Sequence, residues 1–214
     1  MAKNKCTTFF LLILFTLSLW GCHSSSNIPW GYASQSNTSG GVSGADTILS
    51  IVGPVKLDVV NNKWSSNPFT VIASLQNNTD STIIGSSLTL DLSAASGLGL
   101  DTGEVATHDL SDILPGETEQ TSWSILAVAP GFWTYSVQDE TGLTTESSIT
   151  VPILCGDLDH DGDVDEDDYT IFESALGTCS GDSEFNEEAD YDGDGKITYD
   201  DYVKWNDCYE AYNQ

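Results

Sequence analysis

The chain has 214 residues, of which 33 are acidic and 6 basic, so its formal net charge is −27, and no Arg occurs. This charge repels phosphate backbones, so we exclude nucleic acid as a partner and expect cations instead. Six Trp, eight Tyr and seven Phe suffice for folded cores rather than disorder. Residues 155–214 hold 20 acids and 2 Lys, whereas residues 1–154 hold 13 acids and 4 Lys, so we expect a domain boundary near Cys155.

The N-terminal segment has the pattern of an export signal. Two lysines precede an apolar run over residues 9–20, which is too short to span a bilayer and suits a signal-peptide core. The run ends in Leu19-Trp20-Gly21-Cys22, which resembles the lipobox of bacterial lipoproteins. We therefore predict a signal peptide over residues 1–22 and a protein anchored to the bacterial membrane through a lipid on Cys22. Ordinary cleavage after Ser26, giving a secreted protein, is the alternative.

The segment after Cys22 is rich in Ser, Gly and Asn. This composition cannot bury an apolar core. We predict a flexible linker over residues 23–45 that holds the folded part away from the membrane surface.

Residues 46–152 have the pattern of an all-β domain. Seven short runs are rich in Val, Ile, Thr and aromatic residues and often alternate, and Gly, Pro and Asn turn signals separate them. We predict strands at Ile48–Val52, Val55–Val60, Phe69–Leu75, Ser87–Leu92, Thr121–Leu126, Phe132–Gln138 and Ser147–Val151. This number of strands, without a convincing helix, favours an antiparallel β-sandwich. The phrases FTVIASLQNNTD, LTLDLSAASGLGLDTGE and LSDILPGETEQTSWSILAVAPGFWTYSV resemble the immunoglobulin-like modules of bacterial surface proteins, which implies a spacer or adhesion unit.

Some residues of this domain have side chains suited to glycan binding or catalysis. Trp64, Trp123, Trp133 and Tyr135 could form a platform that stacks on a glycan, but Trp123 and Trp133 stand in runs typical of central strands and are expected in the core. His108 lies near two Asp residues, yet the sequence has no nucleophile with a glycine elbow and no distinct carboxylate pair. We therefore expect no catalysis, and the histidine spacing does not indicate zinc.

Residues 153–214 contain one calcium-loop pattern twice, 33 residues apart. Oxygen-bearing side chains stand at loop positions 1, 3, 5, 9 and 12, and Gly stands at position 6, where the chain turns sharply. Ca²⁺ takes 6–8 oxygens, and alternate residues of such a loop aim theirs inward. Position 7 contributes only a backbone carbonyl. We predict two Ca²⁺ ions, held in the first loop by Asp157, Asp159, Asp161, Asp163, Asp165 and Asp168, and in the second by Asp190, Asp192, Asp194, Lys196, Thr198 and Asp201.

The repeat continues beyond the ligands. Val164 and Ile197 occupy position 8, where a short β contact between loops is expected. Helices are predicted to begin near Asp165 and Thr198, each with an apolar face at i, i+3 and i+7. These faces are Tyr169, Phe172 and Leu176 in the first helix, and Tyr202, Trp205 and Tyr209 in the second. Gly177 is a suitable C-terminal cap for the first helix.

A calcium loop followed by a helix, duplicated without a preceding helix, resembles the type I dockerin over Gly156–Tyr212. The resemblance implies a small α-helical domain that binds a cohesin module and gathers enzymes of polysaccharide degradation into surface complexes. Positions 10 and 11, which often contact cohesin in the family, are Glu166-Asp167 and Tyr199-Asp200. Because these pairs differ, binding through two symmetry-related faces is not expected, and an unfamiliar or intramolecular partner is the alternative.

Three cysteines, Cys155, Cys179 and Cys208, remain in an oxidising compartment after processing. Because the ends of a dockerin lie close together, the resemblance favours a Cys155–Cys208 disulfide. Cys179–Cys208 is the alternative pairing.

The sequence thus predicts a non-catalytic, calcium-dependent docking protein on a bacterial surface, built from an Ig-like β-sandwich and a dockerin-like domain. An accessory polysaccharide-degrading enzyme component and a glycan-binding surface module are the alternatives.

Overall fold

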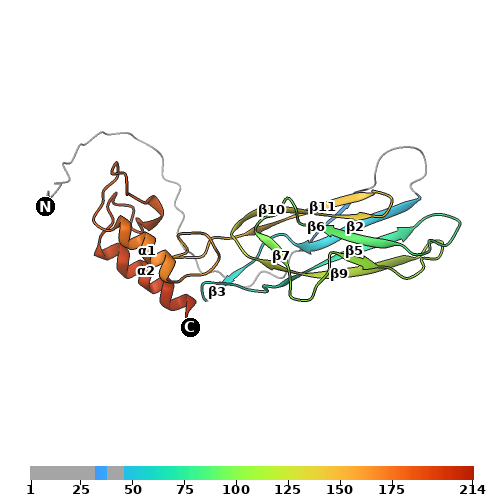
Figure 1. The fold of residues 1–214 in the computed structure, drawn as a ribbon, viewed down its shortest axis with the longest axis horizontal. Coiled ribbons are helices and arrows are strands. Elements are labelled where there is room, and N and C mark those ends of the chain that lie inside the picture. The colour runs from blue at the N-terminus through green and yellow to red at the C-terminus, as the bar shows by residue number, and fades with distance from the viewer. Residues whose placement is uncertain (1–31, 38–45) are drawn as a thin grey trace.

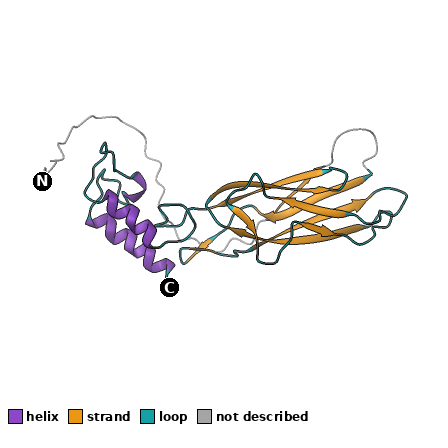
Figure 2. Cartoon of the chain, viewed as in Figure 1, coloured by secondary structure: helices purple, strands orange, loops and turns teal. Residues whose placement is uncertain are grey.

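The computed structural model describes residues 32–37 and 46–214, and for residues 32–37 the backbone alone. Strands make up one end of the described chain and helices the other (Figures 1 and 2). The strands are β1 (Tyr32–Asn37), β2 (Thr47–Pro54), β3 (Val59–Val60), β4 (Lys63–Trp64), β5 (Phe69–Asn77), β6 (Ser87–Asp91), β7 (Leu98–Leu100), β8 (Thr107–Asp109), β9 (Thr118–Ala127), β10 (Gly131–Asp139) and β11 (Thr144–Val151). The helices are α1 (Glu166–Ala175), the 3₁₀ helix η1 (Glu187–Ala189) and α2 (Tyr199–Tyr212).

The strands, here called the β domain, form two antiparallel sheets. One sheet has the order β1-β2-β5-β9-β7, the other has the order β11-β10-β6-β8, and β3 and β4 form a separate hairpin. Burial alternates along the central strands, as in β5, where every second residue from Phe69 is buried. The inward-facing side chains of both sheets form one core, which includes Ile51, Val71 and Trp123 from the first sheet and Leu90, Val137 and Ile149 from the second.

Each of the seven predicted strand regions contains a strand, but Val55–Val60 is only partly extended. Residues 55–57 leave the first sheet and bond to the edge of the second, where the Leu57 amide donates to the Thr150 carbonyl over 3.0 Å. Only Val59–Val60 forms β3. The turn and side-chain pattern did not reveal that the chain crosses between sheets here.

The structure also has strands that the sequence pattern did not predict. β7 and β8 have three residues each, too few for a visible alternation. β1 lies inside the predicted linker 23–45 and pairs with β2, with Tyr32 opposite Pro54. Its Ser- and Asn-rich sequence carries little strand propensity, so the neighbouring edge of β2 provides the hydrogen bonds that define it.

The C-terminal domain, residues 153–214, has a small aromatic core. Phe172 of α1 is fully buried and Trp205 of α2 is 4% exposed, and their ring centroids lie 6.1 Å apart. Tyr169 and Tyr209 pack against this core as the repeat pattern predicts. Leu176 does not, because α1 ends at Ala175 and leaves Leu176 as a C-cap that is 49% exposed. Gly177 follows with φ +86°, the left-handed conformation expected after a helix.

Candidate metal centre

The first calcium loop, residues 157–168, is closed by the start of α1. Asp165 is the N-cap of this helix, and Asp168 completes a capping box with it. The Asp168 carboxylate also accepts the amides of Leu158 at 2.6 Å and Asp159 at 3.2 Å through Oδ1, and that of Asp165 at 2.8 Å through Oδ2. One buried side chain at position 12 therefore fixes both ends of the loop.

Carboxylate oxygens of the first loop converge. Oxygens of Asp157, Asp159 and Asp168 lie within 4.8 Å of one another, and so do oxygens of Asp163, Asp165 and Asp168. Asp157 is 2% exposed, and its Oδ1 is buried without a hydrogen-bond partner, as is Oδ1 of Asp163. Buried carboxylate oxygens without a donor are costly unless a cation binds them.

The pKa values of the loop carboxylates also indicate that the first loop needs a cation. Burial, together with the Asp168 charge, raises the pKa of Asp157 from 3.8 to about 6. Burial is also the main cause that raises the pKa of Asp159 and of Asp163, with neighbouring Asp161 contributing in both. These ligand positions disfavour their own negative charge until a positive ion joins them.

The second calcium loop, residues 190–201, repeats the design. Asp201 is fully buried and accepts the Thr198 amide at 2.8 Å and the Asp192 amide at 3.3 Å. Oxygens of Asp190, Asp192 and Asp194 lie within 4.8 Å of one another. The position-6 amide donates to the position-1 carboxylate in both loops, Gly195 to Asp190 at 2.9 Å and Gly162 to Asp157 at 3.2 Å.

The donor chemistry of both loops suits Ca²⁺. Each loop offers several carboxylate oxygens and no sulfur or imidazole among its predicted ligands, as a hard cation requires. The backbone geometry agrees, since Gly162 and Gly195 at position 6 have φ of +94° and +82°. The residues present therefore fit calcium.

The expected β contact between Val164 and Ile197 is replaced by another one. Ile197 exchanges backbone hydrogen bonds with the segment after α1, donating to Thr178 at 3.0 Å and accepting from Gly177 at 2.8 Å. Residues 195–197 of the second loop thus pair with residues 177–180. Val164 is buried instead against Gly156. A Cβ added to Gly156 would lie 3.0 Å from the Val164 side chain.

A contact between the first loop and the segment before the second loop was not predicted. His160 Nε2, at position 4 of the first loop, lies 3.0 Å from Glu188 Oε2 in η1, directly before the second loop. No ligand pattern marks either residue, because both stand at positions without a calcium ligand.

A disulfide joins Cys155 and Cys208 with a Cα–Cα distance of 5.4 Å, which is the first of the two alternative pairings. It ties the entry of the first loop to the last turns of α2, 53 residues later.

The predicted partner-binding residues are exposed. Glu166 and Asp167 lie in the first turn of α1, and Tyr199 and Asp200 in the first turn of α2. Tyr199 is 71% exposed, and Val203, one turn further on the same helix face, is 42% exposed. The equivalent positions of α1 carry Glu166 and Thr170, so the second repeat offers the more apolar face.

The residues weighed for glycan binding or catalysis are largely engaged in the fold. Trp123 and Tyr135 are 0% and 1% exposed, and Trp133 packs against the core. His108 stacks on Trp123 and its ring nitrogens contact Thr121 and Glu104 at 2.7 and 3.0 Å.

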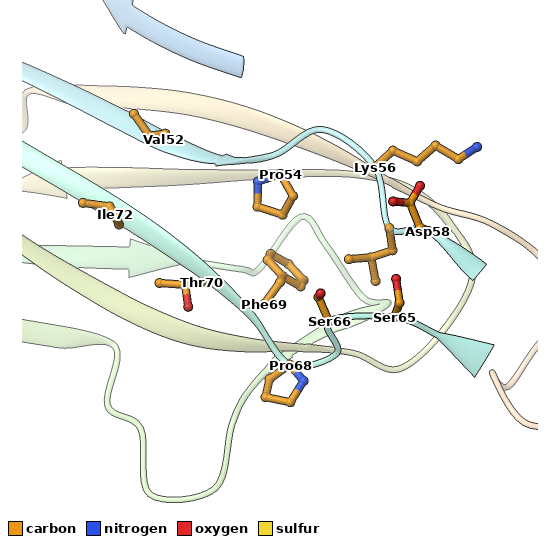
Figure 3. A pocket seen from close by; sticks show the side chains of 11 residues that line it. Val52, Pro54, Lys56, Asp58, Ser65, Ser66, Pro68, Phe69, Thr70 and Ile72 are labelled. Atoms are coloured by element: carbon orange, nitrogen blue, oxygen red, sulfur yellow. The ribbon is translucent and has the colours of Figure 1, made fainter. Parts of the chain in front are cut away.

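The β domain has a cavity of about 580 Å³. Its polar side chains gather near the β3–β4 hairpin, and Val52 and Ile72 lie at the opposite end (Figure 3). Among the described residues that line the cavity, Asp58 supplies the single carboxylate, so they offer no carboxylate pair.

The predicted signal peptide, residues 1–22, and Cys22 lie outside the described residues. In residues 32–37 and 46–214, no helix is long and apolar enough to cross a membrane.

Comparison with known proteins identifies the class of the C-terminal domain. The family model "Dockerin type I domain" matches residues 155–204, which contain both calcium loops. A dockerin domain therefore lies at the C-terminal end of this chain, and dockerin domains bind calcium and cohesin partners. No curated protein matches the chain.

Solved structures resemble the chain only distantly. A FixG-related protein from Vibrio parahaemolyticus is 13% identical with a TM-score of 0.33, over 50% of this chain and 98% of that one. A beta-D-glucoside glucohydrolase from Trichoderma reesei is 13% identical with a TM-score of 0.30, over 57% of this chain and 19% of that one. The archaellum stator protein FlaG from Sulfolobus acidocaldarius is 17% identical with a TM-score of 0.25, over 45% and 99%. Likeness at this level carries no argument about the β domain.

Proposed function

We propose that this protein is an exported, non-catalytic docking protein of the bacterial surface, in which calcium holds the dockerin domain in the form that binds a cohesin-type module. The β domain acts as an Ig-like spacer, and a lipid on Cys22 anchors the chain. The protein takes part in polysaccharide degradation or in the assembly of another surface complex.

One observation carries this proposal: in each loop, carboxylate oxygens of three residues lie within 4.8 Å of one another, and buried oxygens of Asp157 and Asp163 have no donor. A domain that needs a cation to satisfy its interior folds when the cation binds. Binding of a partner to the folded domain then depends on calcium.

The second repeat supplies the partner surface. Tyr199 and Val203 form an exposed aromatic and aliphatic pair, whereas the equivalent pair in the first repeat is Glu166 and Thr170. Tyrosine is enriched among residues that dominate binding energy, and charged rim residues contribute little. The partner therefore binds in one orientation, with Tyr199 at the centre of the contact.

A binding experiment tests this. Immobilised mature protein is exposed to cohesin-type modules in calcium and in chelator. We expect binding in calcium alone, a loss of about tenfold or more for Tyr199→Ala, and less than about threefold for the matched variant Glu166→Ala. Binding that survives chelator, or that depends on Glu166 instead of Tyr199, contradicts the proposal.

Anchoring has its own test. Mass spectrometry of the mature N-terminus should find an acylated Cys22 in the membrane fraction. An unmodified N-terminus beyond Cys22 would overturn the lipid anchor and leave the docking function intact.

A further inference from the structure

The β3–β4 hairpin reaches from the β domain onto the C-terminal domain (Figure 1). Its two turn residues, Asn61 and Asn62, have φ of 51° and 54°. Positive φ at both positions is the geometry of a tight two-residue hairpin turn, which Asn tolerates. The turn presents the Asn62 side chain at the hairpin tip.

Asn62 binds both ends of the disulfide. Its Nδ2 donates to the Cys155 carbonyl at 2.7 Å and to the Cys208 carbonyl at 3.1 Å, and its Oδ1 accepts the Cys155 amide at 2.8 Å. Cys155 lies two residues before Asp157, the first ligand position. The hairpin tip therefore holds the chain where it enters the first calcium loop.

Trp64 contacts the loop itself. Its Nε1 donates to the Pro152 carbonyl at 2.8 Å, and its ring occupies the space where a Cβ on Gly162 would stand. Trp64 also packs against the core of the β domain. Because the Gly162 amide donates to Asp157, the backbone that Trp64 covers is the one that orients the position-1 carboxylate.

A third contact lies beside these two. Lys63 Nζ lies 5.1 Å from the ring centroid of Tyr212, at the end of α2. Lys63 stands on the same hairpin as Asn62 and Trp64, so three consecutive hairpin residues contact the C-terminal domain.

The second loop has no equivalent contact among the described residues. The nearest neighbour of a Cβ on its position-6 glycine, Gly195, is Ser180 of the same domain, at 3.7 Å. The two loops, so similar in ligands, thus differ in their surroundings.

We infer that the hairpin, residues 59–64, is an intramolecular ligand of the dockerin domain that raises the calcium affinity of the first loop alone, so that calcium in this loop locks the two domains together. Coupling between two binding events is reciprocal. If docking of the hairpin strengthens calcium binding, then calcium strengthens docking by the same factor. This inference rests on the calcium binding of the proposed function. It adds that calcium joins the two domains into one long, rigid unit, which holds the partner surface away from the β domain.

The test uses the full mature chain with one loop silenced at a time. Asp192→Ala leaves the first loop to be titrated, and Asp159→Ala leaves the second. Asn62→Gly removes the three side-chain hydrogen bonds and creates an Asn-Gly turn that favours the hairpin. Trp64→Leu removes the aromatic ring that lies against Gly162. Val60→Thr, at a side chain that is 56% exposed on the same hairpin, is the matched control.

Calorimetry should show that Asn62→Gly and Trp64→Leu each weaken calcium binding at the first loop by about tenfold and change the second less than twofold. Val60→Thr should change neither loop. Small-angle scattering should show that calcium makes the wild type extended and rigid, and that the Asn62→Gly chain keeps a broad distribution of domain arrangements in calcium.

Three outcomes overturn the inference. If both loops bind calcium and the hairpin variants change neither, the coupling does not exist and the docking function stands. If the variants weaken both loops equally, the hairpin stabilises the domain in general and not the first loop. If the wild type binds no calcium at either loop, the proposed function fails together with the coupling.

Discussion

One buried carboxylate of the β domain and one of the C-terminal domain differ in what satisfies them. In the β domain, Asp139 is 4% exposed, and its Oδ1 accepts two amides and a hydroxyl from Thr141 and Leu143 in the adjoining turn. In the C-terminal domain, Asp157 is 2% exposed and keeps a buried oxygen without a donor. The polypeptide itself therefore satisfies the Asp139 carboxylate, whereas the Asp157 carboxylate needs an ion.

Their apolar cores differ in the same direction. The core cluster of the β domain has 19 buried hydrophobic residues, and the core cluster of the C-terminal domain has 6. Because a small domain buries little apolar surface, a metal or a disulfide commonly adds the stability that its core does not supply. One chain thus joins a domain with a large apolar core to a domain whose stability depends on an ion.

Removing calcium should have the largest effect. In chelator we expect the C-terminal domain to lose its helices entirely while the β domain stays folded, because repulsion among loop carboxylates is no longer compensated. Far-UV circular dichroism of the full chain should lose the helical signal and keep the strand signal. A strand signal that disappears together with the helical signal would show that the β domain depends on calcium as well.

A core deletion should affect the β domain alone. Leu75 is 1% exposed in β5, which lies between β2 and β9, so Leu75→Ala should cost about 2–5 kcal/mol of unfolding free energy. Denaturant melts should show the loss in the strand transition, with a calcium stoichiometry still at two. A change in stoichiometry would mean that the two domains fold as one unit.

Deletion of a closing carboxylate should affect the C-terminal domain alone. Asp168→Ala removes the acceptor of three loop amides and should weaken calcium binding at the first loop by about 10- to 100-fold. The control is Lys196→Ala at position 7, where the side chain does not ligate and affinity should hold. Calorimetry distinguishes them, and equal losses in the two variants would show that position 12 has no special part.

A smaller effect is expected from pH. Because the pKa of Asp157 is raised to about 6, the folded calcium-free domain binds its proton more tightly than the unfolded chain does. Lowering the pH from 7 to 5 should therefore stabilise the calcium-free C-terminal domain. Part of the helical signal that chelator removes at pH 7 should therefore return at pH 5. Circular dichroism of calcium-stripped protein at both pH values checks this, and a helical signal that is equally absent at pH 5 would contradict it.

Features that depend on residues close together in the sequence could be predicted. The clustering of loop carboxylates, the glycine turns and the helix starts at Asp165 and Thr198 follow from spacing within one loop, because a loop of fixed length brings its own alternate residues together. The strands that carry the β core follow from alternation, because a half-buried strand repeats every two residues. The pattern did not predict where α1 ends. The helical period of apolar residues continues to Leu176, but the helix ends one residue earlier.

Two loops with the spacing of calcium ligands, the helices after them and a β domain before them are predictable, since each depends on neighbours along the chain. Only the packing of the two domains brings Asn62 to Cys155 and Cys208, 93 and 146 residues away. The same packing places Trp64 over Gly162 of the first loop, and nothing equivalent covers the second loop among the described residues. A turn such as Asn61-Asn62 is recognisable in any sequence, but the surface it touches depends on how the domains pack. The two loops are therefore nearly equal in sequence and become unequal only when the chain folds.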